Sequence, residues 1–315
     1  MIKDKVVQEY KYTGKTQKLY SRPHAWNLQA PTHMEWSPDG RLFVVERTTG
    51  KIKDATKGED LSEARPVVQG LEGPSSMTVL ADGRMLVTEF WGGRIREIVE
   101  GSHADGLPLI AEGLKGPYSL AQDRNGRLAV TVRETKTVGR SVEIDLVTGE
   151  IRTLVEGTPL IAPQGFHGFA PPQSFPDDYR LYASCNDWKT VINAAGMPYT
   201  FAHAVTDMVV LVPEENRTYS FNELAKNHLL ANGLGWTGGM IQHPHLDTLY
   251  ITQPLTGSVT ALDLRNLEDD ATLALPVIKN LPLASCVRFD KTGETMFVCS
   301  PANGVIWKVE GAVEA

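Results

Sequence analysis

The chain has 315 residues, 42% of them hydrophobic and 22% charged, and its formal net charge is −7. This composition is typical of a globular protein and argues against intrinsic disorder. Because nonspecific nucleic-acid binding requires clustered basic surface, the acidic balance excludes that class of function.

The cysteine spacing and the lengths of the apolar runs exclude further classes of protein. Cys185, Cys286 and Cys299 are the three cysteines, and they can build neither a disulfide framework nor a Cys-x-x-Cys zinc site. No run of about 18 apolar residues is present, so we expect no membrane contact. The first residues lack the long apolar segment of a signal peptide, which predicts a cytoplasmic protein.

The first segment with strand character is Val6–Tyr12, and a repeat follows it. Copies of the repeat begin at Pro31, Pro74 and Pro117, each 43 residues after the one before, and a fourth begins at Pro163 after 46 residues. Two weaker copies occupy residues 240–252 and 281–298. The sequence therefore contains six units of a length typical of propeller blades.

Each unit is expected to form two strands joined by a tight turn, followed by a third and a fourth strand. The turns carry Asp39-Gly40, Asp82-Gly83 and Asn125-Gly126, dipeptides that tolerate the positive φ of a tight hairpin. This pattern predicts an all-β fold, a six-bladed β-propeller in a single domain over residues 1–315. We expect Val6–Tyr12 to supply the outer strand of the last blade, which closes the ring and removes an exposed edge.

The fourth unit is irregular. An insertion of about residues 187–232 stretches its spacing, and long insertions in compact domains are often functional loops. A lid over a binding site and a tolerated surface insertion are both open interpretations. Residues 220–230 hold the one good helix candidate.

Candidate site residues gather where the first strand of each unit begins and the second ends. We name this face the channel mouth, and the opposite face, which carries the hairpin turns, the turn face. Side chains from all the blades meet at the mouth, which makes it the default binding site. The predicted catalytic residues there are His33, His167, Glu46 and Glu89. The predicted substrate-binding residues are Trp91, Tyr118, Arg133, Asn186, Asp187, Trp188, Trp236 and Gln253.

Each candidate has a structural alternative. His33 would otherwise hydrogen-bond an adjacent blade. Glu46 and Glu89 occupy the same repeat position, which favours a structural role such as an inter-blade salt bridge with Arg47 or Arg94. The pair His243 and His245 falls on a predicted hairpin turn, so we interpret it as a solvated turn rather than a metal site.

The repeat units resemble the six-bladed propellers of the gluconolactonase/regucalcin family, and strictosidine synthase-like, NHL-repeat and virginiamycin B lyase propellers look similar. The segment Ala231–Trp236 is similar to that family's Asn-Gly-Leu segment, whose asparagine binds the catalytic divalent metal. The resemblance implies Asn232 as a ligand of Ca²⁺ or Mg²⁺. The family's acidic ligands fall at Gln29 and near Ser285, where this chain has no carboxylate, although a hard cation prefers carboxylate oxygens.

Blade one also looks like pyrroloquinoline quinone-dependent sugar dehydrogenases, over Pro31–His33 and Glu46–Ile52. That resemblance implies the quinone as an alternative cofactor and an oxidoreductase as an alternative function.

Our interpretation is a small-molecule enzyme, a lactonase- or esterase-like hydrolase or a lyase, in which a histidine or carboxylate moves a proton. A metal or Arg133 would stabilise the developing oxyanion, and the aromatic side chains would bind a ring-bearing substrate. A noncatalytic propeller that binds a protein or peptide through the same face is the alternative from another class. The oligomeric state is left open.

Overall fold

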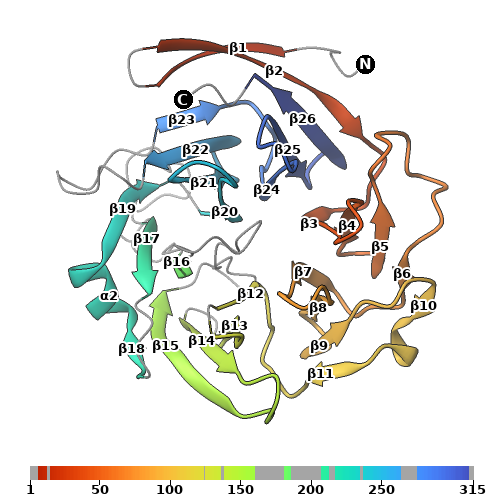
Figure 1. Ribbon diagram of the computed structural model, residues 1–315, viewed down its shortest axis with the longest axis vertical. Helices are drawn as coiled ribbons and strands as arrows, with labels where there is room; N and C mark the ends of the chain where they lie inside the picture. The colour runs from red at the N-terminus through yellow and green to blue at the C-terminus, as the bar shows by residue number, and fades with distance from the viewer. Residues whose placement is uncertain are drawn as a thin grey trace.

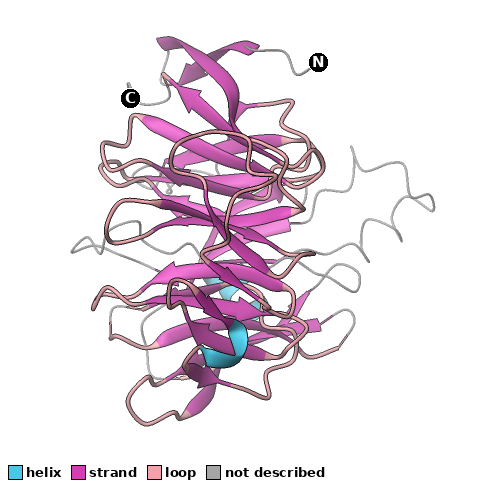
Figure 2. Cartoon of the chain, turned by 90° about the vertical axis from the view of Figure 1, so that its right-hand side faces the viewer, coloured by secondary structure: helices cyan, strands magenta, loops and turns pink. Residues whose placement is uncertain are grey.

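In the computed structural model, the described residues are 6–12, 15–123, 125–135, 138–159, 181–185, 207–212, 217–234, 237–263 and 275–311. Their strands form sheets arranged in a ring about a central axis (Figure 1). Figure 2 shows the ring from the side, with the strands running across its thickness and the loops gathered on its two faces. This is the β-propeller arrangement that the repeat predicted.

The first two repeat copies form blades with the expected strand–turn–strand pattern. In the first blade the strands are β3 (Pro31–Trp36), β4 (Leu42–Glu46), β5 (Lys51–Asp54), β6 (Val68–Gln69) and β10 (Ser102–His103). In the second blade they are β7 (Pro74–Val79), β8 (Met85–Glu89), β9 (Arg94–Glu97) and β11 (Leu109–Ala111), and the 3₁₀ turn η1 (Ala104–Gly106) precedes β11.

Three further sheets have four or five strands each. The third blade contains β12 (Leu120–Gln122), β13 (Leu128–Arg133), β14 (Val138–Ile144), β15 (Ile151–Pro159) and β18 (Tyr219–Ser220). The next complete blade contains β20 (Met240–Gln242), β21 (Thr248–Gln253), β22 (Ser258–Asp263) and β23 (Leu275–Ile278). The last contains β24 (Cys286–Phe289), β25 (Thr295–Ser300), β26 (Val305–Glu310), β2 (Lys15–Ala25) and β1 (Val6–Tyr12).

The prediction of six blades is wrong. The described residues form five blades of four or five strands, and at the fourth repeat copy they form only a three-stranded sheet. Its strands are β16 (Leu181–Cys185), β17 (Asp207–Val212) and β19 (Leu229–Leu234).

The sequence explains why the fourth copy differs. In the first two copies Gly40 and Gly83 hold the hairpin turn at φ +84° and +88°, a region that glycine enters without steric cost. The fourth copy has Tyr179 at the matching position, between Asp178 and Arg180, and a bulky residue disfavours that φ. The hairpin signal is therefore missing from this copy.

Closure by an N-terminal strand is confirmed, although a different segment performs it. β2 pairs antiparallel with β26, with Ser21 opposite Val309. Val6–Tyr12, the segment expected in that place, is β1 and pairs with β2 on its far side. The chain therefore returns to its last blade with two strands, which cover the edge that β26 would otherwise present.

Neighbouring blades pack through apolar side chains. Successive residues of a strand point to opposite faces of the sheet, so β4 contributes to two interfaces. Leu42 packs in a cluster with Ile306 of the last blade, whereas Phe43 packs in a cluster with Val87 of the second blade. This alternation lets β4 join the first blade to the last blade on one side and to the second blade on the other.

The expected helix is confirmed in shorter form as α2 (Phe221–Asn227), whose first turn is capped by Ser220 Oγ accepting from the Glu223 N–H at 3.1 Å. Within the span 187–232, the described residues form β17, β18, α2 and part of β19. Residues 187–206 lie outside the described part, and a lid there stays a prediction. Among the described residues no helix is long and apolar enough to cross a bilayer.

Candidate functional site

At the channel mouth, the first two blades make the same backbone-to-carboxylate contact. The Gln29 N–H donates to Glu46 Oε1 at 2.8 Å, and the Glu72 N–H donates to Glu89 Oε1 at 2.8 Å. Each carboxylate thus ties the segment that leads into the first strand of its blade to the end of the second strand. The expectation that strand starts and strand ends share one face is confirmed.

Glu46 and Glu89 are also neutralised by cations of their own blades. Glu46 pairs with Lys53 Nζ at 3.3 Å, and Glu89 pairs with Arg96 Nε at 2.8 Å and Arg94 Nε at 3.1 Å. Both carboxylates are almost fully buried, and a buried charge needs such partners to offset its desolvation. These contacts favour the structural interpretation, but the ion pairs lie within a blade rather than between blades, and Lys53 rather than Arg47 is the partner of Glu46. A catalytic role for either carboxylate stays a prediction.

His33 lies in a buried polar network between three blades. Its Nδ1 accepts from the Met77 N–H of the second blade at 3.2 Å, and its Nε2 lies 2.8 Å from Arg288 Nη2 of the last blade. Arg288 is 1% exposed and donates Nε to Glu35 at 2.8 Å. Both ring nitrogens of His33 therefore face protein groups, which supports the alternative of an inter-blade contact. Its catalytic role stays a prediction.

Arginine and aromatic side chains gather at the mouth. The guanidinium carbon of Arg47, after β4, lies 4.5 Å from the ring centre of Phe90 and 5.7 Å from those of Trp91 and Tyr118. The guanidinium carbon of Arg133, at the end of β13, lies 5.2 Å from the same Phe90 ring. The structure thus brings three predicted binding residues together, and we name this group of five side chains the arginine–aromatic cluster.

Two members of the cluster were missed as site residues. The sequence predicts Arg47 only as an ion-pair partner of a glutamate, and Phe90 is not among the predicted site residues. The repeat holds a signal for both, because each directly follows Glu46 or Glu89 at the end of a second strand. Positions next to a structural residue of a repeat can differ between blades, and these two point into the mouth.

The aromatic side chains rest on glycines of the neighbouring strand starts. A Cβ on Gly73, at φ +64°, would lie 2.5 Å from the Trp91 ring, and a Cβ on Gly116, at φ +52°, would lie 3.1 Å from the Phe90 ring. Glycine meets both demands without steric cost. The glycines before Pro74 and Pro117 therefore make room for the cluster.

The guanidinium groups are desolvated without full compensation. Burial lowers the pKa of both Arg47 and Arg133, and the nearby Arg47 charge lowers that of Arg133 further. On each of them Nη2 is buried and has no hydrogen-bond partner. Burial raises the pKa of Tyr118, which therefore stays a neutral phenol. This geometry places two positive groups with free donors beside aromatic rings.

The other predicted site residues do not join the cluster in the described part of the chain. Gln253 Nε2 donates to Thr260 Oγ1 at 3.4 Å within its own blade. Asn232 lies in β19, and its side chain is outside what the structure describes. The remaining predicted residues lie outside the described residues: His167, Asn186, Asp187, Trp188 and Trp236.

The described residues do not supply a ligand set for a divalent cation. No three His, Cys, Asp or Glu side chains among them are grouped to hold a metal ion, and Glu46 and Glu89 are already paired with cations. His243 lies on the turn face as expected, but it is buried rather than solvated, because its ring packs on Phe289 and its Nε2 lies 3.2 Å from the Gly293 carbonyl. Metal binding and quinone binding both stay predictions.

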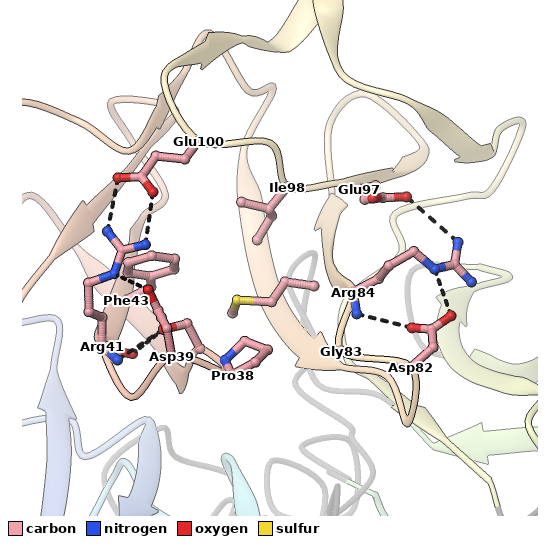
Figure 3. Close-up of a pocket in the computed structure, with 12 residues that line it drawn as sticks. Pro38, Asp39, Arg41, Phe43, Asp82, Gly83, Arg84, Glu97, Ile98 and Glu100 are labelled. Atoms are coloured by element: carbon pink, nitrogen blue, oxygen red, sulfur yellow. Dashed lines mark hydrogen bonds and ion pairs between the residues drawn. The ribbon is translucent and has the colours of Figure 1, made fainter.

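A groove on the turn face, between the first two blades, offers a contrast (Figure 3). On one side Arg41 binds Asp39 and Glu100, each at 2.8 Å, and on the other Arg84 binds Asp82 at 2.8 Å. These exposed pairs contribute little stability, but they give each arginine of the groove a carboxylate partner. The unmatched positive charge therefore distinguishes the channel mouth from this groove.

Comparison with known proteins supports the fold. No family model and no curated protein matches the chain. A gluconolactonase from Xanthomonas campestris is 14% identical, with a TM-score of 0.65 over 93% of this chain and 89% of that one. The shared feature is the β-propeller.

Two further solved structures agree with this. A luciferin-regenerating enzyme is 12% identical, with a TM-score of 0.63 over 91% of this chain and 92% of that one. Virginiamycin B lyase from Staphylococcus aureus is 12% identical, with a TM-score of 0.54 over 97% and 99%. At such low identity the likeness shows the propeller fold shared with these enzymes, and no particular activity.

Proposed function

We propose that the protein is a small-molecule enzyme that works at its channel mouth, by hydrolysis of an ester or lactone or by elimination. The observation that carries the proposal is the arginine–aromatic cluster, in which Arg133 offers a buried Nη2 without a partner. The presence of hydrolases and lyases among proteins of the same fold supports it.

Arg133 is suited to stabilise a developing oxyanion. In both reaction classes negative charge grows on an oxygen of the substrate, and a fixed donor in a site of low dielectric stabilises that charge more than water does. Arg133 is positively charged, lies over Phe90 at 5.2 Å and is partly desolvated. It would therefore reorganise little as the oxyanion forms. The Phe90 and Trp91 rings would bind the apolar part of the substrate.

The proton-transfer group is not assigned to a described residue. Glu46 and Glu89 are held in ion pairs, and both His33 nitrogens face protein groups. Of the predicted catalytic residues, His167 is the one outside the described part, and it stays the remaining candidate for the base.

The test is a screen of aryl esters and small lactones followed by comparison of two variants. Arg133→Met keeps the length of the side chain and removes the donor, and we expect kcat to fall about 10²–10³-fold. Arg84→Met makes the same change in the turn-face groove, and we expect it to leave kcat unchanged. Equal activity of wild type and Arg133→Met, or turnover of no substrate in either class, would overturn the proposal.

A noncatalytic binding protein is the second candidate, favoured by one observation. Trp91 is 57% exposed at the mouth, and exposed aromatic residues are common anchors of protein interfaces. That function predicts no turnover, together with peptide binding that is lost in Trp91→Ala and retained in Arg133→Met.

A further inference from the structure

Arg47 stands apart from the other buried cations. The described residues contain four Arg or Lys side chains that are buried: Arg47, Lys53, Arg96 and Arg288. Three of these have a carboxylate partner: Lys53 pairs with Glu46, Arg96 with Glu89 and Arg288 with Glu35. Within that described part Arg47 has none, and its Nη2 makes no hydrogen bond.

The surroundings of Arg47 are aromatic rather than ionic. The rings of Phe90, Trp91 and Tyr118 lie within 5.7 Å of its guanidinium carbon, and the residue is 5% exposed. Cation–π contacts offset part of the cost of desolvation. They leave the hydrogen-bonding capacity of Nη2 unused, and an unused buried donor is unfavourable. An arrangement that is costly in the free protein is expected where a ligand completes it.

We infer that Arg47 binds the carboxylate of a small-molecule substrate whose flat ring stacks on the aromatic side chains of the channel mouth. That the ligand is a substrate rests on the proposed function. That the ligand carries a carboxylate and a flat ring rests on the contacts of Arg47. A planar guanidinium presents paired donors that match a carboxylate. The rings of Phe90, Trp91 and Tyr118 beside Arg47 provide stacking surface that inorganic phosphate cannot use, which favours a ring-bearing carboxylate over phosphate.

Arg47 and Arg133 are inferred to bind different parts of the substrate. Arg47 is deeper and contacts three rings, so it is placed to hold a group that does not react. Arg133 contacts one ring and is more exposed, so it is placed to meet the reacting carbonyl. The Trp91 ring lies 5.7 Å from Arg47 and is 57% exposed, so it is available to stack on the bound ligand.

The first test measures binding without turnover. Sodium benzoate is the probe, benzamide is the neutral probe of the same shape, and inorganic phosphate is the competing anion. We expect near-saturating benzoate to raise the Tm of the wild type by on the order of 3 °C and neither other probe to do so. We expect no benzoate shift in Arg47→Met and the full shift in Arg84→Met, which removes an exposed turn-face charge.

The ligand-free Tm separates binding from a structural role. Removing an unpaired buried charge relieves a cost, so Arg47→Met without ligand should melt at a higher temperature than the wild type. A lower melting temperature, or a benzoate shift that persists in Arg47→Met, would overturn the inference. A phosphate shift equal to that of benzoate and lost in Arg47→Met would overturn the assignment to a carboxylate.

A kinetic test distinguishes this inference from the proposed function. If esters are turned over, 4-carboxyphenyl acetate should have a higher kcat/KM than phenyl acetate. Arg47→Met should remove that preference, about 10-fold or more, through KM. Turnover with no preference for the carboxylated ester would overturn the inference and leave the proposed function standing. Benzoate binding without any turnover would do the reverse.

Discussion

At the scale of single residues, Glu46 and Glu89 show how a repeat can resemble a catalytic motif. Both end a second strand, and sequence alone leaves open whether such carboxylates act on a substrate or on the fold. The structure gives each a backbone N–H and cationic partners. In the first two blades the recurring glutamate fixes the segment before the first strand to the end of the second strand.

Glu89→Gln tests this structural role. The substitution removes the charge that neutralises Arg96 while keeping an acceptor oxygen, so buried Arg96 loses its carboxylate partner, whereas Arg94 keeps Glu72 at 2.7 Å. Breaking a buried pair costs about 3–5 kcal/mol, and we expect the free energy of unfolding to fall by about that much in a denaturant titration. Glu97→Gln is the matched control, because Glu97 makes a longer, more exposed pair with Arg84 at 3.6 Å. Equal stability of the two variants would contradict the structural role.

At the scale of elements, the sequence predicted the strands wherever a local turn signal existed. Asp39-Gly40 and Asp82-Gly83 mark the hairpins β3–β4 and β7–β8, because turn chemistry is local. The closing strand was misplaced, since strand character alone does not tell β1 from β2 and pairing with β26 is decided nearly 300 residues away. The prediction of a regular blade at the fourth copy was wrong because that copy lacks the local turn signal.

Gly73→Ala tests how the glycines position the arginine–aromatic cluster. The new methyl group would lie 2.5 Å from the Trp91 ring, at a φ of +64°. We expect loss of the backbone term, about 1–2 kcal/mol, plus displacement of Trp91 and weaker benzoate binding. Gly101→Ala is the control, because Gly101 has φ +78° and nothing within 4 Å of the added Cβ. Gly101→Ala should lose stability only through the cost of its positive φ. Calorimetry would measure that loss in both variants, and Trp fluorescence would report the displacement of Trp91 in Gly73→Ala. Unchanged benzoate binding in Gly73→Ala would contradict a positioning role.

At the scale of the whole molecule, the location of the site was predictable and its chemistry was only partly so. The repeat alone indicated that side chains from several blades meet at one mouth, and Trp91, Tyr118 and Arg133 are found together there. The state of each charge depends on partners from other blades. Arg288, from the last blade, lies within hydrogen-bonding distance of His33 Nε2. No carboxylate of the described part neutralises Arg47. Such pairings join residues far apart in sequence, and a single sequence holds no local signal for them.

Contacts between blades also make the stability of the ring depend on pH. His243, between β20 and β21, packs on Phe289 of the last blade with ring centres 4.7 Å apart, and lies 3.2 Å from the Gly293 carbonyl. Burial lowers its pKa from the ordinary value of 6.5. The unfolded chain therefore takes up a proton at a higher pH than the folded one, so the contribution of His243 is fully present above about pH 6.5 and is lost as pH falls below it.

The prediction is a steeper loss of stability in the wild type than in His243→Gln, which keeps a donor for the Gly293 carbonyl but does not titrate. We expect the free energies of unfolding of the two proteins to converge as the pH is lowered from 7.5 to 5, in urea titrations at fixed ionic strength. Parallel curves for His243→Gln would show that the histidine is equally easy to protonate in the folded and unfolded chains, and that its burial between blades carries no charge penalty.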